Sequence, residues 1–370
     1  MAEHFGSSTA LMGLSVGVYL GTSAIFQILV GPLSDRIGRR TVSLWALIIF
    51  SVVSISCVYA PNTFVFMVLR ALQAIAACTF VVARAIVRDT TETQASGSKI
   101  AYISMGTAIC PMFGPALGGL LDGWFGWEAN FWFIGGLGIF ILLIAYFDLG
   151  ETVPENTQGF RQQFSEYPEL LLSRRFWGYC LASAFGAGAF FAYLGGGPFV
   201  GSIVYNLSPE MLGLYFGAPA IGYFFGNFLS GRFTMRFGID AMILWGLWII
   251  FSGLSLSMVC SYVGYGTVET FFGFMIFVGL GNGLTIPNAT AGMLSVRPHL
   301  AGTASGLGGA MMIAIGAALS TLAGAFLIPG SNEMPLLMLM WFSSLSGVAV
   351  IIYVRQRNKR LKKLSNAGAP

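Results

Sequence analysis

The chain has 370 residues, of which 56% are hydrophobic and 9% are charged, and its formal net charge is +4. A soluble domain carries about 25% charged residues, so this composition excludes a soluble enzyme and indicates a protein that lies mostly in a lipid bilayer. The charges are segregated along the chain, so the positive sum does not indicate nucleic-acid binding.

Apolar segments follow one another along the whole chain. A helix that spans a bilayer needs about 20 consecutive apolar residues. Eleven segments of this kind lie at 9–30, 41–60, 64–87, 100–121, 129–148, 176–200, 209–230, 241–263, 269–292, 301–327 and 335–354. We therefore expect an all-α membrane protein with eleven spans. Residues 1–8 carry no basic residue, unlike the start of a cleaved signal peptide.

The first connection reads GPLSDRIGRR and holds one acid and three arginines. Such side chains cannot lie in hydrocarbon, so we expect a loop in water that bends at its glycines and at Pro32. Asp35 and Arg39 are four residues apart and can pair on the first turn of the following helix. The candidate functional residues of this loop are Gly31, Asp35, Arg36, Gly38, Arg39 and Arg40.

The third segment contains arginines inside an apolar run. At 100° per residue Arg70, Arg84 and Arg88 fall on nearly one helix face, with Gln73 about 60° away. An arginine as deep as Arg70 costs several kcal/mol unless it faces a wet cavity or a partner. We expect Arg70 and Gln73 to face a cavity, whereas Arg84 is equally consistent with a side chain that reaches the membrane surface.

The fourth segment carries a glycine–proline pattern, GTAICPMFGPALGG. Gly114 and Gly118 form a small-xxx-small face that permits close helix packing, and the prolines can kink the helix. The candidate residues are Gly106, Pro111, Gly114, Pro115, Gly118 and Gly119.

Aromatic and amide side chains are the candidates for a substrate cavity. Phe190, Phe191 and Tyr193 precede three glycines and Pro198, which we expect to break the helix near the outer surface. Rings beside such a break suit a cavity for apolar molecules, or equally an interfacial aromatic belt. The amides could line the cavity or bond neighbouring helices; they are Asn227, Asn282 and Asn288.

Residues 231–240 repeat the first loop. They read GRFTMRFGID, and a shift of 200 residues lays Gly231 on Gly31, Arg236 on Arg36 and Gly238 on Gly38. Duplicated halves are common in transporters, with the substrate site between them. We expect an N-terminal half at 1–148, a cytoplasmic linker at 149–175, a C-terminal half at 176–354 and a basic cytoplasmic tail at 355–370.

Basic residues define the orientation. Of the 19 Lys and Arg residues, Arg70 and Arg84 lie inside the third segment, and the other 17 lie on the side of the first loop. This asymmetry makes that side cytoplasmic. Eleven spans then place the N-terminus of this chain in the periplasm and the C-terminus in the cytoplasm. The five cysteines lie apart within apolar segments and both histidines lie near segment ends, so we expect no metal site.

The first loop resembles the signature between the second and third helices of the major facilitator superfamily. The third segment resembles the family's helix-4 motif, which is linked to proton transfer, although Ala74 stands where the family usually has glycine. The fourth segment resembles the motif of its antiporter branches. The resemblance implies the major facilitator fold, with two pseudo-symmetric six-helix halves. Because that family has twelve spans, it also implies that the first helix is missing from this chain.

Several stretches together are similar to the bicyclomycin/chloramphenicol-resistance (Bcr/CflA) group of drug:proton antiporters: RALQA, ARAIVRD, CPMFGPALGG, FFAYLGGGPFV and HLAGTASGLGG. The resemblance implies a monomeric multidrug exporter of the bacterial inner membrane that exchanges small amphipathic drugs for protons. The proton gradient supplies the energy, without a cofactor. The resemblance also implies that Asp89 joins Asp35 and Arg39 in a charge cluster that closes the cytoplasmic side.

Two other functions stay open. The first is a facilitator or symporter for a nutrient or metabolite, which the antiporter motif argues against. The second is a non-coupled truncated remnant, because none of the fifteen acids lies near the midplane. A titrating carboxylate is the usual proton carrier, and in the related antiporters it is expected in the first helix. On this ground we expect the chain as it stands not to couple drug export to protons.

Overall fold

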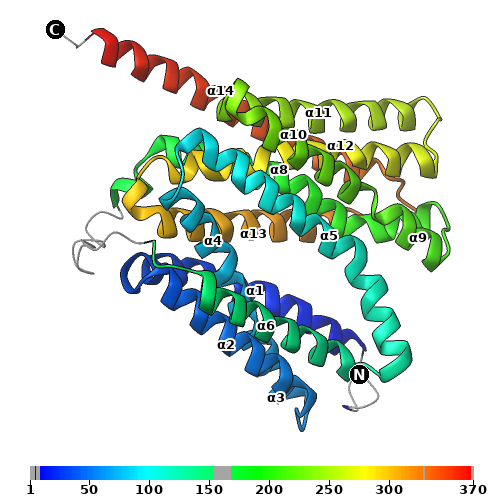
Figure 1. Cartoon of the computed structure of the whole chain (residues 1–370). Coiled ribbons are helices and arrows are strands. Elements are labelled where there is room, and N and C mark those ends of the chain that lie inside the picture. The colour runs from blue at the N-terminus through cyan, green and yellow to red at the C-terminus, as the bar shows by residue number, and fades with distance from the viewer. Residues whose placement is uncertain (1–4, 6–8, 153–167, 328–329, 368–370) are drawn as a thin grey trace. The chain divides into compact units, whose positions relative to one another are not determined.

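The structure is a computed structural model that describes residues 5, 9–152, 168–327 and 330–367 (Figure 1). These residues form helices and connections, without a strand. The elements are α1 (Thr9–Ile37), α2 (Arg39–Val58), α3 (Thr63–Gln73), η1 (Ala74–Ala76), α4 (Ala77–Asp89), α5 (Thr93–Phe125), α6 (Glu128–Asp148), α8 (Arg174–Phe199), η2 (Val200–Val204), α9 (Pro209–Phe216), α10 (Ala218–Phe237), α11 (Ile239–Tyr262), α12 (Val268–Leu294), η3 (Pro298–Leu300), α13 (Ala301–Phe326) and α14 (Met334–Ala367).

The helices agree with the apolar segments of the sequence. Each of the eleven segments lies on one helix or on a run of consecutive helices. Among the described residues, eight helical segments are long and apolar enough to cross a membrane. The all-helical architecture is therefore confirmed, while the eleven spans and the missing first helix stay predictions.

The helices form two compact units. Unit 1 contains the described residues of Met1–Thr90, Phe113–Pro168 and Arg297–Ala310, and unit 2 contains those of Thr91–Met112, Glu169–Val296 and Met311–Pro370. Two helices, α5 and α13, therefore have residues in both units. The division into halves that the repeat predicts stays a prediction, and residues 153–167 of the predicted linker lie outside the described residues.

Unit 1 is built on α1, α2, α3, α4 and α6. Small and β-branched side chains from three of these helices pack into one buried cluster, in which burial of apolar surface is the main stabilising term. Its members are Val30, Val42, Ala46, Cys78, Val81 and Val82.

The predicted loop at 31–40 is wrong in its extent. The first helix continues through Pro32 to Ile37, so Arg36 lies exposed on its last turn and only Gly38 separates α1 from α2. Helices of membrane proteins tolerate proline, whereas the turn itself requires the φ of 100° that Gly38 adopts and that side chains disfavour. Gly238 has a φ of 82° between α10 and α11, so the shift of 200 residues relates the two turns.

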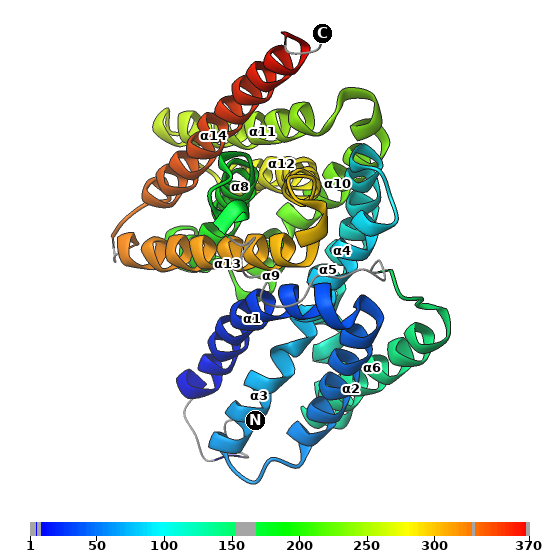
Figure 2. The same ribbon diagram turned by 90° about the vertical axis from the view of Figure 1, so that its left-hand side faces the viewer.

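Unit 2 is organised around α12. This helix packs along α8, α10 and α11, and α14 packs against α8 and α11 (Figure 2). The contact between α10 and α12 depends on glycine: a Cβ on Gly222 would lie 1.9 Å from the carbonyl oxygen of Ile276, and one on Gly279 would lie 1.8 Å from that of Pro219. Small residues at such spacing let membrane helices approach closely.

Substitution of Gly279 by alanine is therefore expected to destabilise unit 2. The added methyl group would overlap the Pro219 carbonyl, and the two helices would have to separate, at a cost of about 1–3 kcal/mol. Thermal unfolding of the detergent-solubilised protein measures the effect. Gly273→Ala on the same helix is the control, since nothing lies within 4 Å of its Cβ position. Equal melting temperatures for the two variants would contradict the prediction.

The helix break predicted at the glycines before Pro198 is also wrong. The helix α8 continues to Phe199 and is followed by the π-helical turn η2. The glycines serve close packing instead. A Cβ on Gly195 would lie 2.4 Å from the Oγ atom of Ser320 on α13, and one on Gly197 would lie 2.9 Å from the ring of Phe216.

Candidate functional site

Three charged side chains meet at the ends of α1, α2 and α4. The Nη2 atom of Arg39 lies 2.5 Å from Oδ1 of Asp35, and its Nε atom lies 3.1 Å from Oδ2 of Asp89. The exposed fractions of these side chains are 3%, 2% and 12% in the order Arg39, Asp35, Asp89. Arg39 also donates to Ser34 Oγ at 2.7 Å. The pair does not lie on one helix as expected, because it forms across the Gly38 turn.

The Asp35 carboxylate also binds the N-terminus of α13. The backbone N–H groups of Gly302 and Thr303 donate to its two oxygens at 2.9 and 3.0 Å, and the Thr303 hydroxyl donates at 3.0 Å. The first N–H groups of a helix lack partners within it and carry partial positive charge. Glycine permits this approach, since a Cβ on Gly31 would lie 2.5 Å from the carbonyl oxygen of Gly302.

A second carboxylate, Glu151, binds the N-terminus of α2. The backbone N–H groups of Arg39 and Arg40 donate to it at 2.8 and 3.2 Å. The Arg40 guanidinium donates to the carbonyl oxygen of Tyr146, at the end of α6, at 2.9 Å. Sequence reasoning missed Glu151. The available signal was Gly38, which precedes α2 and has no side chain to cap it.

A buried polar network surrounds Arg70 in unit 1. Its guanidinium donates to the side-chain oxygen of Gln73, and Gln73 donates to Ser54 Oγ on α2 at 2.8 Å. The guanidinium carbon lies 5.1 Å from the centre of the Tyr19 ring on α1, in cation–π geometry. Gln73 is 1% exposed. The predicted proximity of Arg70 and Gln73 is therefore present, together with partners from two other helices.

The helix that carries Arg70 is interrupted. The 3₁₀ turn η1 follows Gln73 directly and separates α3 from α4. A 3₁₀ turn inside a helix often marks a hinge. It includes Ala74, the position at which the family usually has glycine. Arg84 lies half-buried on α4, and Asp89 ends that helix.

The antiporter motif lies on α5, which extends over 33 residues. Gly106 has open space at its Cβ position, and Gly118 accepts a hydrogen bond from the Asn130 side chain of α6 at 3.3 Å. The contacts of Pro111, Gly114, Pro115 and Gly119 lie outside what the structure describes.

The aromatic candidates on α8 differ in their surroundings. Tyr193 is fully buried, stacks on Phe216 with ring centres 4.7 Å apart and donates to its carbonyl oxygen at 3.0 Å. Phe190 and Phe191 are half-buried, and Phe191 packs over Gly316. Phe190 and Phe191 thus retain surface that a ligand could contact, whereas Tyr193 serves the packing of unit 2.

The amide candidates also separate into two kinds. Asn288 bonds α12 to α10: it donates to Ser230 Oγ at 2.7 Å and accepts from Thr234 Oγ1 at 2.9 Å. The side-chain oxygens of Asn227 and Asn282 are buried and accept no hydrogen bond from a described residue. Buried polar atoms are usually satisfied, so these two oxygens are the better candidates for a water or substrate contact.

Comparisons with known proteins agree with this architecture. The sequence profile of the Major Facilitator Superfamily matches residues 1–321. A chloramphenicol resistance protein of Pseudomonas aeruginosa is 31% identical over 85% of this chain and 76% of its own length. A bicyclomycin resistance protein homolog of Haemophilus influenzae is 26% identical over 90% and 84%. The crystal structure of the human organic anion transporter MFSD10 (TETRAN) shares the fold, with a TM-score of 0.72 and 18% identity over 95% of this chain and 87% of that one. The chain therefore belongs to the major facilitator superfamily, whose members are membrane transporters and not enzymes, and within it to the Bcr/CflA type.

Proposed function

We propose that this protein is a secondary active multidrug exporter of a bacterial inner membrane, and that it exchanges small amphipathic drugs for protons by alternating access. The alternative is the non-coupled remnant that the positions of the fifteen acids favour, and the transport experiment below decides between the two. Two relatives are named for resistance to chloramphenicol and to bicyclomycin. The glycine–proline pattern of α5 resembles that of antiporters, which favours export over symport. Substrate candidates are Phe190, Phe191, Asn227 and Asn282, with Arg70, Gln73 and Arg84 as the proton-linked candidates.

The observation that carries the proposal is the buried carboxylate of Asp35. It binds Arg39 and the N-terminus of α13, segments more than 260 residues apart in the sequence. Unpaired buried charges cost several kcal/mol each, so the cluster favours the arrangement in which α13 is in place. When α13 moves away, water must replace its N–H groups. We assign the cluster to a gate that opens during transport when the N-terminus of α13 leaves these contacts.

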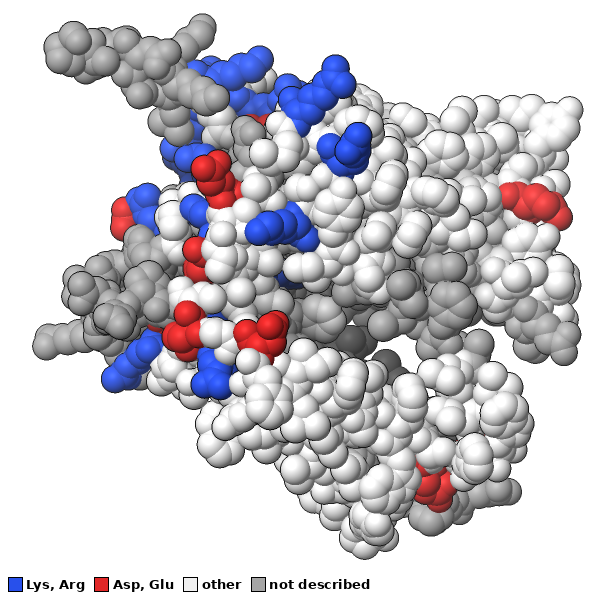
Figure 3. All heavy atoms as spheres, viewed as in Figure 1, with Lys and Arg blue, Asp and Glu red and all other residues white. Residues whose placement is uncertain are grey.

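The proposed topology has eleven spans, with the first loop, the linker and the C-terminal tail in the cytoplasm. On the face shown in Figure 3, the Lys and Arg side chains of unit 2 gather near the end from which α14 projects, and none lies at the opposite end. The positive-inside rule assigns the basic end to the cytoplasm. The gate would then be the cytoplasmic one.

Transport by the purified protein tests the proposal. In liposomes with an interior more acidic than the bath, radiolabelled chloramphenicol is expected to accumulate, because protons leave as drug enters, and an uncoupler is expected to abolish accumulation. Accumulation that requires the opposite gradient would indicate a symporter. Equilibration that the uncoupler leaves unchanged would contradict proton coupling and agree with the expectation drawn from the positions of the acids. Vesicles without protein provide the background.

A further inference from the structure

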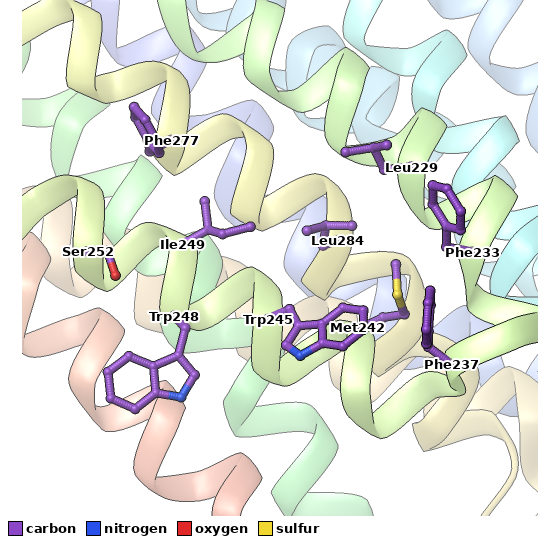
Figure 4. A pocket seen from close by; sticks show the side chains of 10 residues that line it. All are labelled: Leu229, Phe233, Phe237, Met242, Trp245, Trp248, Ile249, Ser252, Phe277 and Leu284. Atoms are coloured by element: carbon purple, nitrogen blue, oxygen red, sulfur yellow. The ribbon is translucent and has the colours of Figure 1, made fainter.

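An aromatic groove lies on the surface of unit 2, where α10 and α11 diverge from the Gly238 turn. One wall is formed by α10 and the other by α11, and α12 lies between them as the floor. The groove has a volume of about 670 Å³, which is within the range of small-molecule sites. Figure 4 shows Phe233, Phe237, Met242 and Trp245 at one end, and Ser252 and Phe277 at the other.

The groove runs along α11, a helix that is long and apolar enough to cross a membrane. Along α11 the helical rise places Trp245 about 9 Å, and Ser252 about 20 Å, from the Gly238 turn. The hydrocarbon core is about 30 Å thick, so the groove reaches from the basic end of unit 2 to just beyond the midplane. Trp245 and Trp248 are each 43% exposed. The groove therefore has the length and the lining that suit one acyl chain.

Two arginines lie beside the groove on α10. Arg232 and Arg236 are one turn apart and both are exposed, on the helix face next to that of Phe233 and Phe237. The guanidinium carbon of Arg236 lies 5.3 Å from the centre of the Phe237 ring, which lines the groove. Neither arginine forms an ion pair with a described residue. Guanidinium groups bind phosphate through paired hydrogen bonds.

We propose that the groove binds one anionic phospholipid of the adjoining leaflet, with an acyl chain along Trp245 and Trp248 and the phosphate on Arg232 and Arg236. Because both arginines are positively charged, they favour a lipid with an anionic headgroup over an uncharged apolar molecule. The apolar lining of the groove matches a lipid acyl chain. The two arginines lie near the Gly238 end of the groove, where the lipid headgroup would be. This inference does not depend on the direction or the coupling of transport.

The internal repeat supports a separate role for this surface. The shift of 200 residues lays Phe233 on Leu33 and Met235 on Asp35. In the first copy Asp35 pairs with a buried arginine. In the second copy no acid occupies that position, and aromatic rings replace aliphatic side chains. Ile239 stands where Arg39 forms that pair, so the second copy lacks both partners of the buried ion pair, and its arginines, Arg232 and Arg236, are exposed on the surface.

Tryptophan quenching by brominated lipids tests the proposal with the full chain. The protein is reconstituted in phosphatidylcholine vesicles that contain an equal fraction of dibrominated phosphatidylglycerol or dibrominated phosphatidylcholine. Each arginine near an anionic headgroup favours binding about five-fold. We expect the apparent affinity for the brominated phosphatidylglycerol to be at least about five-fold higher. Because the chain has eight tryptophans, the double variant Trp245→Phe/Trp248→Phe gives the background.

The preference for phosphatidylglycerol over phosphatidylcholine is expected to disappear in the double variant Arg232→Gln/Arg236→Gln. It is expected to persist in the control Lys359→Gln/Arg360→Gln, which removes two exposed charges from α14. Equal quenching by the two lipids in the wild type would overturn the proposal. So would loss of the preference in both double variants, since this would indicate general attraction to the membrane surface. Displacement of both lipids alike by an apolar drug would assign the groove to a small molecule instead and would also overturn it.

Discussion

Replacing Asp35 with asparagine is expected to reduce drug export to the level of vesicles without the protein. The side chains have the same shape, but asparagine is neutral, and its NH₂ group cannot accept the N–H groups of Gly302 or Thr303. Arg39 would stay buried with Asp89 as its remaining acid. Breaking a buried pair costs about 3–5 kcal/mol, which lowers the population of the closed gate roughly a hundred-fold or more. Accumulation of labelled chloramphenicol measures the loss.

The matched control is Asp148→Asn, which makes the same chemical change at an exposed residue at the end of α6. It is expected to transport like the wild type, and both variants are expected to reach the membrane in normal amounts. Thr303→Val removes one hydroxyl donor but leaves the charges, so an intermediate rate is expected. Wild-type resistance in cells that express Asp35→Asn would contradict the assignment of the gate.

The local part of the cluster could be predicted from the sequence, and the distant part could not. The four-residue spacing predicted that Asp35 and Arg39 pair, although it placed them on one helix and not across the Gly38 turn. That Asp89 belongs to the cluster was predicted from the resemblance to a family and not from its spacing. The N-terminus of α13 is more than 260 residues away, and Glu151 is more than 100 residues from the arginines that it caps. Gly38 indicates a helix start that has no side-chain cap of its own, but a single sequence does not specify which distant residue supplies the cap.

Hydropathy predicted which segments are helical because burial in lipid demands satisfied backbone hydrogen bonds. It did not predict where helices end. Pro32 and the three glycines before Pro198 are all helical, since membrane helices accept residues that break helices in water. The turns occur where a positive φ is required, at Gly38 and Gly238. Whether a glycine serves a turn or close packing depends on the neighbouring helix, which the sequence does not specify.

Replacing Arg70 with alanine is expected to abolish transport, while Arg70→Lys is expected to retain part of it. Arginine within a span is costly unless it is paired, and among the described residues its contacts are one hydrogen bond to Gln73 and the ring of Tyr19. The guanidinium has five N–H donors, so further donors are available to a drug or to water. Lysine keeps the charge and the cation–π contact but loses the planar fork. Transport rate and drug binding by the purified protein are the measurements.

A purely structural role for Arg70 predicts a different pattern. Loss of the network would then lower the thermal stability of both variants together with transport, because Gln73 would lose its partner in the buried space next to Ser54. We expect instead that Arg70→Ala melts close to the wild type, since it removes a costly charge, and yet fails to bind drug. Arg360→Ala, an exposed arginine on α14, is the control and is expected to behave as wild type. If Arg70→Ala still binds and accumulates chloramphenicol, the side chain has no part in the transport pathway. If Arg70→Lys binds drug as tightly as the wild type while Arg70→Ala does not, the charge and not the planar fork is what the substrate recognises.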